Sequence, residues 1–121
     1  MRLDKLTKAA VAALEDIKGR DIVVLDVKKM SALFDWIVIA TADSSRQSRA
    51  LSNNVQEKMK ALGARVYSVE GESTGEWVLV DLGSIVVHIM QPATRQYYNL
   101  EELWAQPARA RRRRAADSAA R

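Results

Sequence analysis

Apolar residues recur along the chain with two periods, one typical of helices and one typical of strands. Near the start, a spacing of three or four residues predicts an amphipathic helix, which Gly19 ends because glycine readily adopts the conformation that terminates helices. The apolar positions of this helix are Leu3, Leu6, Ala10, Leu14 and Ile17. Two runs rich in β-branched residues then predict buried strands at residues 21–27 and 34–41.

A second amphipathic helix is predicted after Ser44, because Gln47 follows three residues later and completes a capping box. Gly63 ends this helix, whose apolar face consists of Leu51, Val55, Met59 and Leu62. Residues 65–69 predict a third strand, and residues 76–81 and 84–90 predict a hairpin that turns at Leu82-Gly83. The residues that follow are expected to form a short helical turn.

This order of elements predicts one α/β domain, in which a mixed sheet of about five strands is packed with helices. A two-residue turn at Leu82-Gly83 puts three pairs on one sheet face: Trp77 with His88, Leu79 with Val86, and Asp81 with Ser84. The expected core lies on the other face: Val78, Val80, Ile85, Val87 and Ile89. Because leucine tolerates a positive φ poorly, a bulged turn with another register is the alternative.

Composition places the chain among ordinary globular proteins, since 48% of its residues are apolar and 28% are charged. Its apolar runs are too short to cross a membrane, and no apolar signal core begins the sequence, so we expect a cytoplasmic protein. The chain has no cysteine and one histidine, which argues against disulfides and against metal sites built on thiolate or imidazole. We therefore expect no cofactor.

The net charge of +4 is unevenly distributed. Residues 107–121 contain six arginines and one aspartate, whereas residues 1–106 contain 13 basic and 14 acidic residues and are nearly neutral. Because the terminal segment has too little apolar content to fold by itself, we expect one domain at residues 1–106 and a flexible basic tail at residues 107–121. The candidates for contact with RNA phosphates are Arg111, Arg112, Arg113 and Arg114.

Aromatic residues are scarce, yet four of them lie within residues 70–104: Trp77, Tyr97, Tyr98 and Trp104. One predicted strand face mixes rings, apolar groups and polar groups, as protein-binding surfaces do: Trp77, Leu79, His88 and Met90. Trp36 and Trp104 are interpreted as packing residues, and His88 as a strand histidine with no metal. This segment therefore predicts a surface that binds a protein partner.

Eight short motifs are spread along the chain at residues 18–22 (KGRDI), 35–41 (DWIVIAT), 45–47 (SRQ), 70–71 (EG), 77–81 (WVLVD), 86–90 (VVHIM), 95–98 (RQYY) and 100–104 (LEELW). In this order they resemble the ribosomal silencing factor family, also called Iojap or RsfS. The resemblance covers about residues 3 to 104, and the arginine-rich tail lies outside the family pattern.

The resemblance implies a translation repressor that is not an enzyme, with a nucleotidyltransferase-like topology that lacks the active site. Family members bind the large ribosomal subunit through ribosomal protein L-fourteen and block joining of the small subunit. This silences ribosomes as a stress response to nutrient limitation. The residues expected to bind the partner are Trp77 as the central anchor, with Leu79, His88, Met90, Tyr98, Glu70 and Asp81 around it.

A magnesium-dependent enzyme is one alternative, because clustered carboxylates at strand ends hold Mg²⁺ in many phosphoryl-transfer enzymes. The strand-end carboxylates of this chain are Asp21, Asp26, Asp35 and Asp81. However, Gly83-Ser84 is not followed by the closely spaced acidic pair that nucleotidyltransferases use, and no P-loop is present.

An RNA-binding ribosome-assembly factor is another alternative, because a polar stripe runs along the second long helix: Arg46, Arg49, Asn53, Gln56 and Lys60. The aromatic face of the protein also suits a second copy of the chain, since exposed apolar surface favours self-association. A homodimer formed through this face would compete with ribosome binding.

Overall fold

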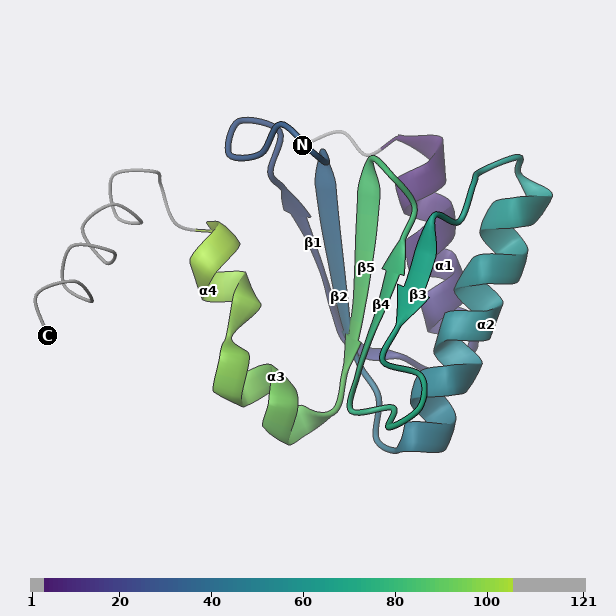
Figure 1. The fold of residues 1–121 in the computed structure, drawn as a ribbon, viewed down its shortest axis with the longest axis vertical. Coiled ribbons are helices and arrows are strands. Elements are labelled where there is room, and N and C mark those ends of the chain that lie inside the picture. The colour runs from purple at the N-terminus through teal and green to yellow at the C-terminus, as the bar shows by residue number, and fades with distance from the viewer. Residues whose placement is uncertain (1–3, 106–121) are drawn as a thin grey trace, which may run out of the picture.

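Helices cover both faces of a five-stranded mixed sheet in the computed structural model, which describes residues 4–105 (Figure 1). The elements are α1 (Lys5–Asp16), β1 (Arg20–Asp26), β2 (Trp36–Thr41), α2 (Ser45–Ala61), β3 (Ser68–Glu70), β4 (Trp77–Asp81), β5 (Ile85–Met90), α3 (Pro92–Tyr98) and α4 (Leu100–Ala105). Both long helices lie on one face of the sheet, and α3 and α4 lie on the other. The predicted fold class is confirmed.

The strands are arranged in the order β1-β2-β5-β4-β3, with β2 and β5 parallel and every other pair antiparallel. All residues of β2 and β5 are buried, because they occupy the middle of the sheet and helices cover both of its faces. The predicted core positions Val78, Val80 and Val87 are fully buried on the side of α1 and α2. Trp36 is buried in the same cluster, as expected.

Polar side chains start both long helices and fix their relative position. Asp4 caps α1 by accepting a hydrogen bond from the backbone N–H of Thr7, and Ser44 caps α2 in the same way through Gln47. The side-chain oxygen of Gln47 accepts from the N–H of Asp43, and its amide donates to the carbonyls of residues 17 and 18 at the end of α1. The predicted cap is therefore confirmed, except that the side chain of Gln47 accepts from the backbone N–H of Asp43 instead of that of Ser44.

The predicted hairpin register is wrong by two residues, because the turn lies at Gly83-Ser84 instead of Leu82-Gly83. The N–H of Leu82 donates to the carbonyl of Ile85, and Gly83 has a φ of 89°. Glycine at the first central position suits a two-residue hairpin turn, and it spares leucine a positive φ. The observed pairs are Trp77 with Met90, Leu79 with His88, and Asp81 with Val86. A two-residue shift keeps each side chain on its predicted face.

The structure also corrects the third strand and the last helical segment. β3 begins at Ser68, three residues later than predicted, and contains only three residues. The expected helical turn is two helices, α3 and α4, which meet at Asn99 in the left-handed conformation. Leu100 and Trp104 of α4 pack against a second apolar cluster: Val27, Ile37, Ile39 and Met90. The predicted tail and its boundary at residue 106 lie outside the described residues, among which no helix is long and apolar enough to span a membrane.

Candidate functional site

Three rings that are distant in sequence meet on the sheet face that carries α3 and α4. The indole Nε1–H of Trp77 donates to Nδ1 of His88 over 3.0 Å. The ring of Tyr98, from α3, also packs against the indole, with 4.7 Å between centroids. We call Trp77, Leu79, His88 and Tyr98 the aromatic face. Because Trp77 is only half-buried and Tyr98 is 52% exposed, this cluster reaches the surface.

The hydrogen bond fixes the chemical form of His88. An indole N–H can only donate, so Nδ1 of the imidazole is an acceptor and the single proton of the neutral ring lies on Nε2. The side chain lies in the sheet at 8% exposure, and this burial lowers the pKa of His88 to about 4. The imidazole is therefore neutral near pH 7, and it serves as a polar support for Trp77.

An apolar pocket of about 540 Å³ lies next to the aromatic face. Its walls come from all strands except β1, from α4 and from the loop before β2, and they include Phe34, Leu79, His88, Leu100 and Trp104. The charged residues in its lining, Glu70 and Asp81, are both acidic. A smaller pocket of about 240 Å³ is lined by Glu70, Gly71, Trp77 and Leu79. This surface fits an apolar side chain that has basic residues beside it.

The structure brings together five of the seven predicted partner-binding residues in accessible or half-accessible positions: Trp77, Leu79, Tyr98, Glu70 and Asp81. Glu70 is exposed at the end of the edge strand β3, and one carboxylate oxygen of Asp81 caps the hairpin turn by accepting from the N–H of Gly83. His88 is buried but borders the larger pocket. Met90 is fully buried in the second apolar cluster, against which both Trp77 and α4 pack, so its predicted contact with a partner is corrected to a core role.

The carboxylates considered for a magnesium site are dispersed. Asp21 and Asp26 lie at opposite ends of β1, beside Arg20 and Lys28 respectively. One carboxylate oxygen of Asp81 already accepts a hydrogen bond from the N–H of Gly83 in the hairpin turn. Within residues 4–105, no three His, Cys, Asp or Glu side chains are grouped closely enough to hold a metal ion.

Part of the polar stripe on α2 has a structural role. The guanidinium of Arg49 donates to the carbonyls of Glu72 and Ser73, which holds the loop between β3 and β4 against the helix. The amide of Gln56 donates to the hydroxyl of Ser52. Three stripe residues remain as exposed candidates for RNA contact: Arg46, Asn53 and Lys60.

Sequence reasoning missed the residues that complete the larger pocket. Leu33 is 83% exposed in the loop before β2, and Phe34 makes an edge contact with Trp104, with ring centroids 5.7 Å apart. In the sequence Leu33 and Phe34 stand at the start of the strand predicted at residues 34–41, so nothing there indicated a surface role. Trp104 does pack against the second cluster, as predicted.

A family model described as "Ribosomal silencing factor during starvation" matches residues 1–121. The chain belongs to the ribosomal silencing factor family. Its similarity to individual proteins is high: the ribosomal silencing factor RsfS of Chromobacterium violaceum is 51% identical over 104 residues, which cover 86% of this chain and 85% of the relative. The family predicted from the eight motifs is confirmed.

A solved structure and a longer relative support the same assignment. The crystal structure of a protein from Chromobacterium violaceum is similar with a TM-score of 0.83 and 49% identity, covering 89% of this chain and 92% of that chain. A Mus musculus protein, "Mitochondrial assembly of ribosomal large subunit protein 1", is 35% identical over 97 residues. This match covers 78% of this chain but only 42% of the mouse protein.

Proposed function

We propose that this protein binds the large ribosomal subunit through ribosomal protein L-fourteen and thereby blocks joining of the small subunit. The aromatic face carries the proposal, because its half-exposed indole lies beside an apolar pocket in a chain of this family. Buried tryptophans often dominate the energy of protein interfaces. In this proposal Trp77, Leu79 and Tyr98 contact the ribosomal protein, and Glu70 and Asp81 attract its basic residues.

The proposed mechanism is steric exclusion. A rigid domain that occupies part of the joining surface prevents a second macromolecule from occupying it, and the free energy of one binding event then opposes the other. Binding alone is sufficient, so the proposed function is repression of translation under nutrient limitation without catalysis. The family's description as a silencing factor during starvation supports this regulatory role.

A role in assembly of the large subunit is the second candidate. The name of the mouse relative refers to assembly of the large subunit, and three exposed polar residues of the α2 stripe are available for RNA. Both functions use the large subunit as the partner. They differ in whether small-subunit joining is inhibited when mature large subunits are used.

The test compares wild-type protein with Trp77→Ala in co-sedimentation with purified large subunits, followed by addition of small subunits. We expect Trp77→Ala to fold but to bind about 30-fold more weakly, since loss of a central tryptophan costs roughly 2 kcal/mol or more. Wild-type protein should also reduce the fraction of joined ribosomes. Trp77→Phe, which keeps a ring but loses the N–H bonded to His88, should fall between them.

Leu62→Ala is the matched control. Leu62 is an apolar residue that is 45% exposed at the end of α2, on the opposite side of the sheet from the aromatic face. We expect this control to bind and to inhibit joining like wild type. Equal binding by Trp77→Ala and Leu62→Ala would reject the proposed surface, whereas tight binding without inhibition of joining would favour the assembly role.

A further inference from the structure

Residues 92–105, which we call the C-terminal arm, cross the sheet as the two short helices α3 and α4 (Figure 1). Helices of seven and six residues are too short to be stable alone, and no residue of α3 is buried. The position of the arm therefore depends on the contacts that it makes with the rest of the domain. This position matters because Tyr98 ends α3 and Trp104 lies in α4.

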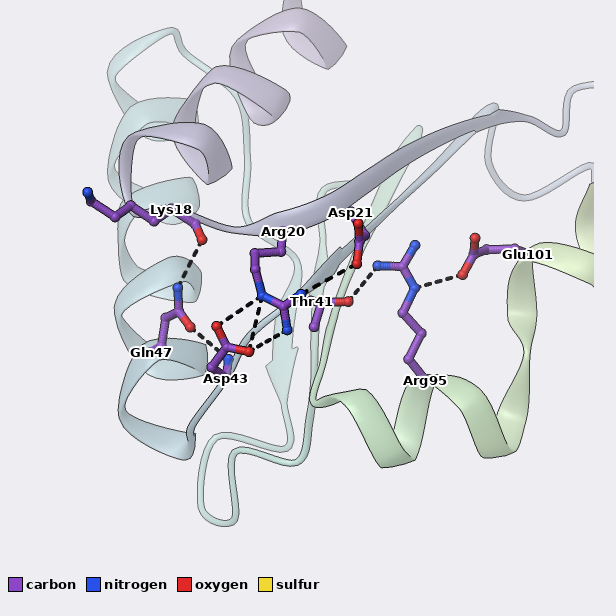
Figure 2. A network of polar contacts seen from close by, with 8 residues as sticks. All are labelled: Lys18, Arg20, Asp21, Thr41, Asp43, Gln47, Arg95 and Glu101. Carbon is purple, nitrogen blue, oxygen red and sulfur yellow. Dashed lines mark hydrogen bonds and ion pairs between the residues drawn. The ribbon is translucent and has the colours of Figure 1, made fainter.

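Arg95 connects three elements through one side chain. Its Nη1–H donates to the hydroxyl of Thr41 at the end of β2, and its Nε–H donates to the carboxylate of Glu101 in α4. The donor–acceptor distance is 2.7 Å in both bonds. Figure 2 shows the guanidinium reaching from α3 into the space between these two acceptors. The side chain of Arg95 thus spans the bend at Asn99 and ties both helices of the arm to the sheet.

The environment makes the loss of either partner costly. The side chain of Arg95 is 11% exposed and that of Glu101 is 34% exposed, so the ion pair is partly shielded from water. Removal of one partner leaves the other charge partly buried and without compensation. A planar guanidinium can bond two acceptors in fixed directions, whereas the ammonium of lysine is a single point of charge.

The other side of the adjacent polar pocket, of about 330 Å³, is held by a separate set of bonds. Arg20 pairs with Asp43 and lies 3.6 Å from Asp21, and its hydrogen bond lowers the pKa of the Asp43 carboxyl. Asp43 is held in turn by Gln47 (Figure 2). Because Arg20 is already paired with Asp21 and Asp43, it does not compete with Arg95 for the carboxylate of Glu101.

The geometry points to Arg95 as a positioning residue for partner binding. Its bonds to Thr41 and Glu101 fix the bend of the arm. This bend holds Tyr98 against Trp77, and it keeps Trp104 in the wall of the apolar pocket. Arg95 acts through these residues and does not itself line the apolar pocket. This inference rests on the proposed function, since it assigns Arg95 to the same surface. It adds a residue whose role is to order the surface.

The test uses Arg95→Gln and Glu101→Gln, with Lys8→Gln as the matched control on the exposed face of α1. We expect Arg95→Gln and Glu101→Gln each to weaken binding to large subunits roughly ten-fold, as the loss of a charged hydrogen bond predicts. The double variant should be no more than about two-fold weaker than Arg95→Gln, because both changes remove one contact. Arg95→Lys should recover part of the affinity.

Amide hydrogen exchange separates a positioning role from a general structural role. In Arg95→Gln, exchange should become faster at residues 96–105 while the amides of β2, β5 and α2 keep their wild-type protection. Unchanged exchange in the arm, or wild-type affinity of Arg95→Gln, would overturn the inference. Faster exchange throughout the sheet would also overturn it, because Arg95 would then support the whole fold.

Failure of the inference about Arg95 can be distinguished from failure of the proposed function. If wild-type protein does not bind large subunits, the proposed function fails, and the exchange pattern still reports whether Arg95 orders the arm. If wild-type protein binds and Arg95→Gln binds equally well, only the role of Arg95 fails. Lys8→Gln should match wild type in both measurements.

Discussion

At the scale of single residues, Trp77 and His88 depend on each other. The indole needs an acceptor on the imidazole, and that acceptor exists only while Nδ1 is unprotonated. Burial keeps the ring neutral by lowering the pKa of His88 to about 4, against an ordinary value of about 6.5. The orientation of the proposed anchor is therefore insensitive to pH across the physiological range.

Acidification should nevertheless reduce folding stability through His88. Between pH 6.5 and pH 4 the unfolded chain binds a proton at this histidine while the folded chain does not, so the free energy of unfolding falls as the pH falls. We expect about 2 kcal/mol less stability at pH 5 than at pH 7.5 from this residue. Urea unfolding of wild type and His88→Gln at both pH values measures it, and equal pH dependence in the two proteins would contradict it.

At the scale of elements, periodicity located most helices and strands, but it did not determine what covers each face. Alternation placed Trp77, Leu79 and Asp81 on one side of β4 correctly, because the period of a strand is two. The same pattern could not show that Met90 is buried, since its cover comes from α4. The bend at Asn99 was missed because α3 buries no residue and so has no apolar period to detect.

The hairpin register was missed for a reason of turn chemistry. Both Leu82-Gly83 and Gly83-Ser84 contain the glycine, and only the position of the positive φ distinguishes them. The exposed part of the candidate site was easier to predict, because aromatic residues at the surface are rare and hence informative. Phe34 and Arg95 joined the site through tertiary contacts that no local pattern records.

Gly71 controls the path of the chain into β4. It has a φ of 90°, and a Cβ atom there would lie 1.9 Å from the carbonyl oxygen of Trp77. We expect Gly71→Ala to shift this carbonyl, to lower the free energy of unfolding by about 2 kcal/mol or more, and to weaken binding to large subunits. Chemical denaturation and co-sedimentation measure the two effects.

Gly63→Ala is the control for this substitution. Gly63 has a similar φ of 87°, but a Cβ atom there would meet nothing within 4 Å. It should therefore show only the backbone penalty of about 1 kcal/mol and normal binding. If both alanine variants behave alike, the close approach to Trp77 has no specific effect.

At the scale of the whole molecule, charge is divided between a nearly neutral domain and a basic terminus. If the six arginines after residue 107 contact ribosomal RNA, removal of residues 107–121 should weaken large-subunit binding more at low salt than at high salt. Replacement of Arg111, Arg112, Arg113 and Arg114 by glutamine should have a similar effect while keeping the length. Titrations at two salt concentrations measure this, and unchanged affinity at both would reject an RNA contact by the tail.

The order of the strands also determines when this domain can fold during its own synthesis. Within residues 4–105, β5 is the last strand in sequence order, yet it is the central strand of the sheet. A nascent chain that stops before Ile85 contains two separate strand pairs, β1 with β2 and β3 with β4, and lacks the strand that joins them. The sheet is therefore completed only after nearly all of the described chain has been translated, so folding begins late and depends on contacts between distant segments.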